Sequence, residues 1–201
     1  TTPILLPPIE DQNAIADFLD RETARIDTLI DCKVRYQAAL KQRAKTMCHK
    51  LVFALNDDQC ERQSSGVPWL PEVPKHWMVR RCAQIFQTLD FRRIPLSSEQ
   101  RANLEKTYPY YGASGQIDWV DGYLFDEDSI LVGEDGANLV LQSTPIAFKA
   151  TGKYWVNNHA HILKPLRGDF DYWIAALNEV PYEIYVTGSA QPKLTAVALN
   201  N

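Results

Sequence analysis

Long apolar runs are absent from this sequence. No stretch approaches the roughly eighteen consecutive apolar residues of a membrane-spanning helix, and no secretory signal peptide is visible. The four cysteines, at positions 32, 48, 60 and 82, form no CxxC pair, which argues against a zinc site or a disulfide framework. We therefore expect reduced thiols, a cytoplasmic location and no membrane partner. Because the chain begins Thr1-Thr2-Pro3 without a methionine, we also expect an excerpt or trimmed form of a longer protein.

Enzyme signatures are missing too. The sequence has neither GxGxxG nor GxxxxGK[ST], the glycine loops that hold phosphates, and no Asp/Asn-Pro-Pro-aromatic tetrad of the kind an adenine methyltransferase needs. Residues 133–138 resemble a glycine loop, but the two acidic residues inside it would repel a polyanion. We therefore expect a tight connection between strands there, and we expect that this chain catalyses nothing.

One histidine cluster, at residues 157–161 (NNHAH), raises the question of a metal site. On a strand the i, i+2 spacing would place the imidazoles of His159 and His161 on one face. No Cys, Asp or Glu stands nearby in the sequence to complete a tetrahedral set, so we expect neither a metal nor another cofactor. We predict instead that one His or Asn of the run is structural and that its polar neighbours face a ligand.

A basic surplus is also missing. The chain carries 21 Lys and Arg against 25 Asp and Glu; residues 1–65 hold 9 against 10, and residues 66–201 hold 12 against 15. Nucleic-acid-binding modules usually have a basic surplus, so composition alone does not suggest DNA. A DNA surface would have to come from local clustering. The pairs Arg80-Arg81 and Arg92-Arg93 are candidates, although neighbouring side chains on a strand point to opposite faces.

What the sequence does contain is a charged helical run of more than forty residues, roughly Ile9 to Leu55. Its apolar positions form a stripe with three-to-four spacing that Lys33 and Gln37 interrupt, and they are Ile15, Leu19, Ile26, Leu29, Ile30, Val34, Leu40, Met47 and Leu51. Such a length is typical of a coiled-coil strut, and at 1.5 Å per residue the helix would extend about 70 Å. We predict that it pairs with a second helix and that isolated chains self-associate through it. Residues 56–66 are polar and predict a linker, so we divide the chain at 1–65 and 66–201.

The second part predicts a mixed α+β domain. Six short β-like runs are separated by turn signals, at residues 123–125, 129–132, 139–141, 146–148, 154–156 and 161–163. Residues 170–180 (FDYWIAALNEV) predict a short helix. This order indicates a twisted sheet that is mixed or mostly antiparallel, carried by the long helix.

At this point the chain resembles a known family. Residues 6–27, which begin Leu6-Pro7-Pro8-Ile9-Glu10, are similar to the central helix of the DNA-specificity subunit of type I restriction–modification enzymes. The remainder resembles that family's target recognition domain, on the strength of VPWLPEVPKHW at 67–77, YPYYGASG at 108–115, WVNNHAH at 155–161 and TGSAQPKL at 187–194. The family alternates recognition domain and helix twice, so this chain corresponds to one period, helix first.

The resemblance implies a module that binds double-stranded DNA, reads one half of a split target and docks modification and restriction subunits. Catalysis would then belong to those subunits. Two alternatives stay open, an unusual methyltransferase or nuclease and a protein-interaction scaffold, the latter favoured by the acidic balance. The expected DNA contacts lie in four loops, and they are Tyr110, Tyr111, Ser114, Asn138, Lys153, Asn157, His159, Ser189, Gln191 and Lys193. Amides such as Asn138 can pair with adenine edges, and Lys153 on a turn can hold a phosphate, whereas half or more of the tyrosines are expected in the core.

Overall fold

The computed structural model describes residues 3–57, 59–188 and 191–200. The chain divides into two compact units, Thr1–His49 and Lys50–Asn201. Among the described residues, no helix combines the length and the apolar character needed to cross a bilayer.

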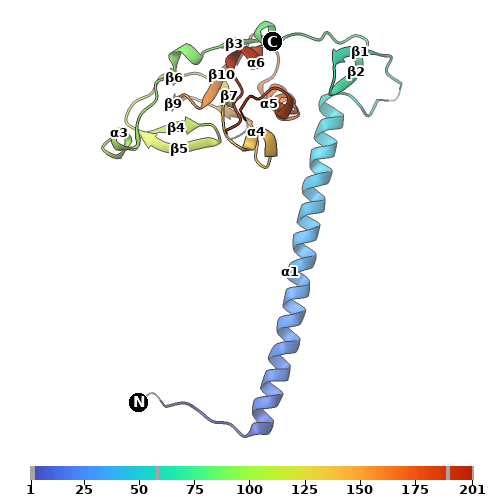
Figure 1. Cartoon of the computed structure of the whole chain (residues 1–201), viewed down its shortest axis with the longest axis vertical. Helices are drawn as coiled ribbons and strands as arrows, with labels where there is room; N and C mark the ends of the chain where they lie inside the picture. Colours follow the sequence, from blue (N-terminus) through green and yellow to red (C-terminus); the bar gives the residue numbers. More distant parts are fainter. Residues whose placement is uncertain (1–2, 58, 189–190, 201) are drawn as a thin grey trace. The chain divides into compact units, whose positions relative to one another are not determined.

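The first unit consists mostly of one helix, α1 (Ile9–Val52), of 44 residues, which ends just inside the second unit (Figure 1). No glycine or proline interrupts it, and Glu10 and Asp11 in the first turn favour the positive end of the helix dipole. The predicted apolar positions are exposed along it; Ile15, Ile26 and Leu29 are 53%, 53% and 55% exposed. The predicted long helix is thus confirmed, with an apolar stripe that nothing in this unit covers.

The C-terminus of α1 is closed by a left-handed residue. Ala54 has a φ of 48°, its N–H donates to the Leu51 carbonyl, and the N–H of Leu55 donates to the Lys50 carbonyl at 2.8 Å. This pattern of bonds satisfies the last carbonyls and stops the helix. Val52 and Phe53 then pack into a small cluster with the hairpin formed by β1 (Arg62–Val67) and β2 (Leu70–Pro74).

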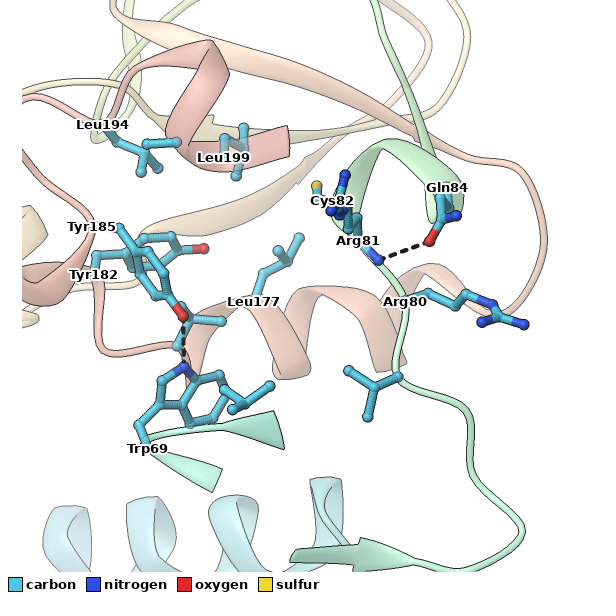
Figure 2. Close-up of a pocket in the computed structure, with 14 residues that line it drawn as sticks. Trp69, Arg80, Arg81, Cys82, Gln84, Leu177, Tyr182, Tyr185, Leu194 and Leu199 are labelled. Carbon is cyan, nitrogen blue, oxygen red and sulfur yellow. Dashed lines mark hydrogen bonds between the residues drawn. The ribbon is translucent and has the colours of Figure 1, made fainter. Parts of the chain in front are cut away.

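A hydrogen bond between two aromatic side chains joins the hairpin to the rest of the second unit. Trp69, in its turn, donates from Nε1 to the hydroxyl of Tyr185 at 2.9 Å (Figure 2). Tyr185 follows the short helix η2 (Tyr182–Ile184). The segment that we predicted as a linker therefore includes an ordered strand, because the Ser-Ser-Gly sequence forms a bulged hairpin rather than a flexible connection.

The core of the second unit is built on a four-stranded antiparallel sheet. Its strands, in spatial order, are β3 (Phe86–Thr88), β10 (Ala160–Pro165), β7 (Ser129–Gly133) and β8 (Ala147–Ala150). All five residues of β7 are buried, as expected of a strand that is covered on both faces. Its side chains alternate: Ile130 and Val132 belong to one apolar cluster and Leu131 to another.

Helices cover the first of those faces and a second sheet covers the other. The helical layer consists of α2 (Cys82–Ile85), α5 (Phe170–Asn178), η2 and α6 (Ala196–Asn200). The second sheet has the order β5 (Gly115–Val120), β4 (Tyr108–Gly112), β9 (Lys153–Val156) and β6 (Phe125–Asp126). Among the strands of the described residues, only β4 and β9 pair in parallel. The predicted α+β class with a mostly antiparallel, mixed sheet is confirmed.

Two local predictions differ from the structure. Residues 139–141, which we predicted as a strand, lie in a short helix, α4 (Asn138–Leu141), which ends at Gln142 with a left-handed φ of 44°. β4 and β5 form where we expected a loop. The remaining short elements are η1 (Asp90–Arg92) and α3 (Ser98–Ala102), and the latter begins with Ser97 as a capping residue.

Candidate functional site

Four connections of the second unit meet at one end of the two sheets. The turn at 113–114 joins β4 to β5, residues 134–137 follow β7, residues 157–159 join β9 to β10, and residues 187–193 precede α6. The Glu134 N–H donates to the His159 carbonyl at 2.9 Å, and the Gly136 N–H donates to the Pro192 carbonyl at 3.0 Å. Backbone bonds therefore hold the second connection against the third and the fourth. We call this group of connections the loop cluster.

The remaining contacts complete the cluster. The Asn157 N–H donates to the Tyr111 carbonyl at 3.1 Å, which joins the third connection to the end of β4. Gly133 lies close against the β4–β5 turn. A Cβ built on it would stand only 2.8 Å from the Ala113 carbonyl oxygen. A backbone atom cannot move aside as a flexible side chain can. Glycine at 133 is therefore required by the approach of the turn to β7.

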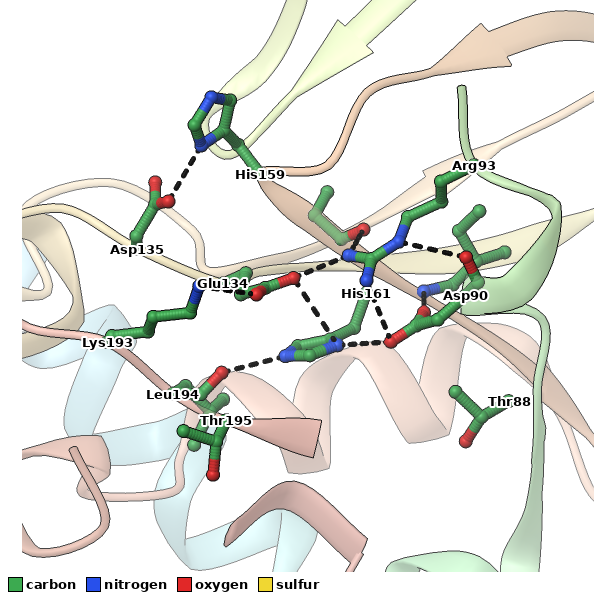
Figure 3. A network of polar contacts seen from close by, with 12 residues as sticks. Thr88, Asp90, Arg93, Glu134, Asp135, His159, His161, Lys193, Leu194 and Thr195 are labelled. Atoms are coloured by element: carbon green, nitrogen blue, oxygen red, sulfur yellow. Dashed lines mark hydrogen bonds and ion pairs between the residues drawn. The ribbon is translucent and has the colours of Figure 1, made fainter. Parts of the chain in front are cut away.

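A buried histidine, His161, makes polar contacts next to the loop cluster. The side chain of His161, on β10, is 1% exposed; its Nδ1 lies 2.5 Å from Asp90 Oδ2 and its Nε2 lies 2.8 Å from the Leu194 carbonyl (Figure 3). Both ring nitrogens face acceptors, an arrangement that suits the doubly protonated imidazolium. Burial disfavours this charge, but the bonds to Asp90 and to Leu194 outweigh it and raise the pKa of His161.

The acidic residues in the cluster contact neighbouring basic side chains. Glu134 is 7% exposed, and its carboxylate lies 2.5 Å from Arg93 Nη1 and 3.1 Å from Lys193 Nζ. Burial opposes ionisation, yet these two cations lower the pKa of Glu134. Asp135 Oδ2 lies 2.7 Å from Nδ1 of His159. The acids that we expected to repel a polyanion thus both contact basic side chains within the cluster, of which His159 and Lys193 are about half exposed.

A cavity of about 540 Å³ opens beside the third connection. One wall consists of Asn157, Asn158 and His159, and the opposite wall comes from the segment Pro95–Arg101. Ser97, Gln100 and Arg101 contribute polar groups to that wall, and none of them figured among the predicted contacts. In the sequence this segment is a proline followed by a short capped helix, and neither feature marks it as a candidate contact.

The structure brings several predicted contact residues together. Ser114, Asn157, His159, Gln191 and Lys193 all belong to the loop cluster, and all except Asn157 are exposed. Asn157 is 5% exposed, and its side-chain oxygen accepts from the N–H of His159 at 2.8 Å, so it shapes the connection from inside. Ser189 lies outside the described residues.

Lys153 is separated from the cluster. It begins β9, whereas Asn157 follows the end of that strand, and four residues of strand span about 13 Å. Its ammonium lies 4.7 Å from the centre of the Tyr123 ring, and the nearby Tyr123 and Tyr108 raise its pKa. Lys153 thus lies at the opposite end of β9 from Asn157 and His159.

Three of the predicted contact residues already make contacts within the chain. Tyr110 is 1% exposed and its hydroxyl accepts from the Leu96 N–H at 2.9 Å, so it is a core residue. Tyr111 is half-buried and packs edge-on against Tyr154 at 5.8 Å between ring centres. The amide of Asn138 is occupied locally: its oxygen accepts from the N–H groups of residues 143 and 144, both at 3.1 Å, and its nitrogen donates to the carbonyl of residue 144. The Tyr110 hydroxyl and the Asn138 amide are therefore occupied within the chain.

The arginine pair at 92–93 is also committed internally. Arg92 lies 2.8 Å from Glu127 and stacks over the Phe125 ring, and Arg93 binds Glu134. The residues lie in and just after η1 rather than on a strand. His159 and His161 do not share a face either, because β10 begins at Ala160 and leaves His159 in the preceding turn. The prediction of one structural histidine beside exposed polar neighbours fits this arrangement.

No cluster of His, Cys, Asp or Glu among the described residues has an arrangement that could hold a metal ion. The buried polar network that the structure does contain was only partly visible in the sequence. Asp90, Arg93, Glu134 and His161 are separated by up to 71 positions, so spacing gave no signal for their contact. The histidine run at 157–161 was the single indication.

Comparison with known proteins identifies the family. The family described as "Type I restriction modification DNA specificity domain" matches residues 74–201. A putative type I restriction enzyme specificity subunit of Haemophilus influenzae, S.HindORF215P, is 33% identical over 111 residues, which cover 53% of this chain and 27% of that protein. The chain therefore spans only about a quarter of the length of this curated relative.

Two solved structures share the fold. The S subunit of a type I restriction–modification system from M. genitalium aligns with a TM-score of 0.53 and 17% identity, over 96% of this chain and 48% of that one. A chain from a study of complex assembly and conformational transition of the type I R-M system aligns with a TM-score of 0.50 and 15% identity, over 98% and 47%. The family match, over residues 74–201, covers more than half of this chain. The chain therefore belongs to the type I restriction–modification DNA specificity domain family.

Proposed function

We propose that the second unit reads one half of a bipartite DNA target through the loop cluster. The observation that carries this proposal is the convergence of four connections that bear exposed hydroxyl, amide, imidazole and ammonium groups. Ser114 and Gln191 would read base edges, since hydroxyls and amides can pair with bases in the major groove. His159 and Lys193 would approach phosphates, which position the protein without reading sequence.

The charge pattern of the cluster supports this role in a chain of net charge −4. Glu134 is paired with Arg93 and Lys193, and the Asp135 carboxylate contacts the His159 imidazole, so both acids are engaged within the chain. The imidazolium of His161 adds a positive charge beneath the cluster. Local compensation of this kind replaces the overall basic surplus that most DNA-binding modules carry.

The long helix would set the distance to the other half of the target. At 1.5 Å per residue, 44 residues extend about 66 Å. Its exposed apolar stripe would pair with a second helix, either of a longer chain or of a second copy. On this proposal modification and restriction subunits dock onto the assembly and supply methyl transfer and cleavage. The chain itself would contribute recognition and spacing.

The proposal is tested by methylation of a randomised target library with the enzyme reconstituted from this chain and its partner subunits. Gln191→Ala is expected to relax the target at one position, because a good base contact discriminates by about 1–3 kcal/mol. Lys193→Gln should weaken binding to every sequence and lower the salt slope by about 1. Lys153→Ala is the matched control, since this lysine lies away from the cluster, and it should change neither.

Two outcomes would reject the proposal. If Ser114→Ala, Gln191→Ala and Lys193→Gln all leave the methylated sequence and the affinity unchanged, the loop cluster does not face DNA. If the reconstituted assembly forms but binds DNA without any salt dependence, the scaffold alternative is favoured, because phosphate contacts always release counterions.

A further inference from the structure

A second cavity, of about 460 Å³, lies in the helical layer (Figure 2). Trp69 and Val67 of the hairpin close one side, α5 and η2 contribute Leu177 and Tyr182, and α6 contributes Leu199. Most of these side chains are apolar. A volume in this range is typical of a pocket for a small organic molecule, and the lining favours a flat apolar body.

One polar group inside this cavity has no partner. Tyr182 is 2% exposed, and its hydroxyl makes no hydrogen bond within the described part of the chain. In Figure 2 the hydroxyl points into the space bounded by Leu177 and Leu199. Buried hydroxyls in folded proteins ordinarily have a partner. Tyr185 provides the contrast, since its own hydroxyl is occupied by Trp69.

The opposite end of the cavity is cationic. Arg80 and Arg81 both line it and both are exposed, and neither has an acidic partner among the residues that the structure describes. Nη2 of Arg80 approaches the Met78 sulfur at 3.4 Å. Between these arginines and Tyr182 lies Cys82, and burial raises the pKa of its thiol to about 11. The thiol is therefore neutral at physiological pH, and the positive charge is confined to the mouth.

We propose that this cavity binds a small aromatic carboxylic acid that carries a hydroxyl or carbonyl group at the end remote from its carboxylate. The ring occupies the apolar space, the carboxylate faces Arg80 and Arg81, and the remote oxygen accepts a hydrogen bond from Tyr182. This site shares no side chain with the loop cluster, so it stands or falls independently of DNA recognition.

Three related probes test the assignment by calorimetric titration of the full chain. 6-Hydroxy-2-naphthoate presents both polar ends, 2-naphthoate lacks the hydroxyl, and 2-naphthol lacks the carboxylate. We expect 6-hydroxy-2-naphthoate to bind about three- to ten-fold more tightly than 2-naphthoate, the usual effect of one hydrogen bond. It should bind about two- to five-fold more tightly than 2-naphthol, as expected for a solvent-exposed ion pair.

Matched variants assign each difference to a residue. In Tyr182→Phe the two acids should bind equally, and this change removes only a hydroxyl that has no partner, so folding is preserved. In Arg81→Gln the advantage over 2-naphthol should shrink, whereas Arg167→Gln, at an exposed arginine outside the cavity, should leave it unchanged. Ala198→Leu fills the cavity and should abolish binding. The proposal is overturned if no probe binds saturably, if binding survives Ala198→Leu, or if the two differences persist in Tyr182→Phe and Arg81→Gln.

Discussion

Replacing His161 by phenylalanine should destabilise the second unit strongly. The ring volume is retained, but Asp90 loses its closest cation and the Leu194 carbonyl loses its donor. The Asp90 side chain is 14% exposed, so its charge would remain largely buried. Removing one partner of a buried ion pair costs about 3–5 kcal/mol. We expect a value near the lower limit, because Asp90 keeps the Ile162 N–H at 2.8 Å and Arg93 at 3.5 Å.

The effect should depend on pH in a defined direction. The pKa of His161 is raised above its usual 6.5, so the folded state holds the proton more tightly than the unfolded chain. Its stabilisation is therefore complete below about pH 6.5 and is lost as pH rises through the folded-state pKa. For Asp90 and Glu134, burial favours the neutral acid, but hydrogen bonds to cations lower both pKa values. Their stabilisation is present above the unfolded-state values and is lost as pH falls through the folded-state pKa.

The contribution of His161, Asp90 and Glu134 to the unfolding free energy of the wild type should consequently be highest between about pH 4.5 and 6.5. Above that range His161 contributes a slope of at most about 1.4 kcal/mol per pH unit, the limit for one proton. The His161→Phe variant should lack this slope. The free-energy difference between the two proteins should therefore be largest in mild acid and smaller at pH 9.

Urea unfolding monitored by tryptophan fluorescence is a suitable assay, because all five tryptophans lie in the second unit and the helix contributes no signal. His159→Gln is the matched control: that imidazole also contacts a carboxylate, but it is 47% exposed, and its loss should cost less than about 1 kcal/mol. If His161→Phe were as stable as His159→Gln, or if its deficit were constant from pH 6 to 9, the buried imidazolium would be refuted.

Three further expectations follow from single contacts. Gly133→Ala should cost about 1–3 kcal/mol and weaken DNA binding by the reconstituted enzyme, because the new methyl group meets the Ala113 carbonyl; urea unfolding and a gel shift would check both. Asn138→Ala should lower the unfolding free energy by about 1–3 kcal/mol and leave the methylated sequence unchanged, since its amide bonds only to its own loop; library methylation would expose any change in specificity. Isolated chains should self-associate through α1 at tens of micromolar, and Leu29→Lys should oppose it; a monomeric wild type with an intact helix in sedimentation experiments would contradict this.

Periodic features of the sequence predicted the structure well. The helix of 44 residues has an apolar stripe with three-to-four spacing, interrupted at Lys33 and Gln37, and no glycine or proline, so its existence followed from local pattern alone. β7, β9 and β10 were also expected, because short apolar runs between turn signals leave few alternatives to a buried strand. These elements are determined by burial, which the order of apolar residues records directly.

Other elements depended on contacts that no local pattern records. β4 and β5 contain proline, glycine and aromatic residues, and they become strands because β9 offers β4 a parallel partner. Residues 139–141 are as apolar as a strand, yet Gln142 at a φ of 44° ends the segment after one helical turn. Propensity is a weak guide where tertiary pairing decides the outcome.

The candidate site was likewise only partly predictable from the sequence. The sequence located the four connections, because glycines and polar residues mark turns wherever they occur. It did not reveal which side chains within them are occupied. Asn138 and Gln191 are both loop amides, but only the structure shows that the first is bonded to the backbone of its own loop while the second is exposed. Residue type identifies candidate contacts, and hydrogen-bond accounting separates them.

The number of basic side chains that are already paired within the chain also indicates how tightly this chain can bind DNA by itself. Arg92, Arg93, Arg101, Lys106 and Lys164 each form an ion pair within the second unit, so they are not free to replace counterions on phosphates. Lys193 is shared with Glu134. Because non-specific affinity depends on the number of phosphates neutralised, few contacts imply weak binding with a modest salt slope. On the proposed function, discrimination between sequences therefore resides in this chain, whereas most of the affinity must come from the second half-site and from the subunits that dock beside it.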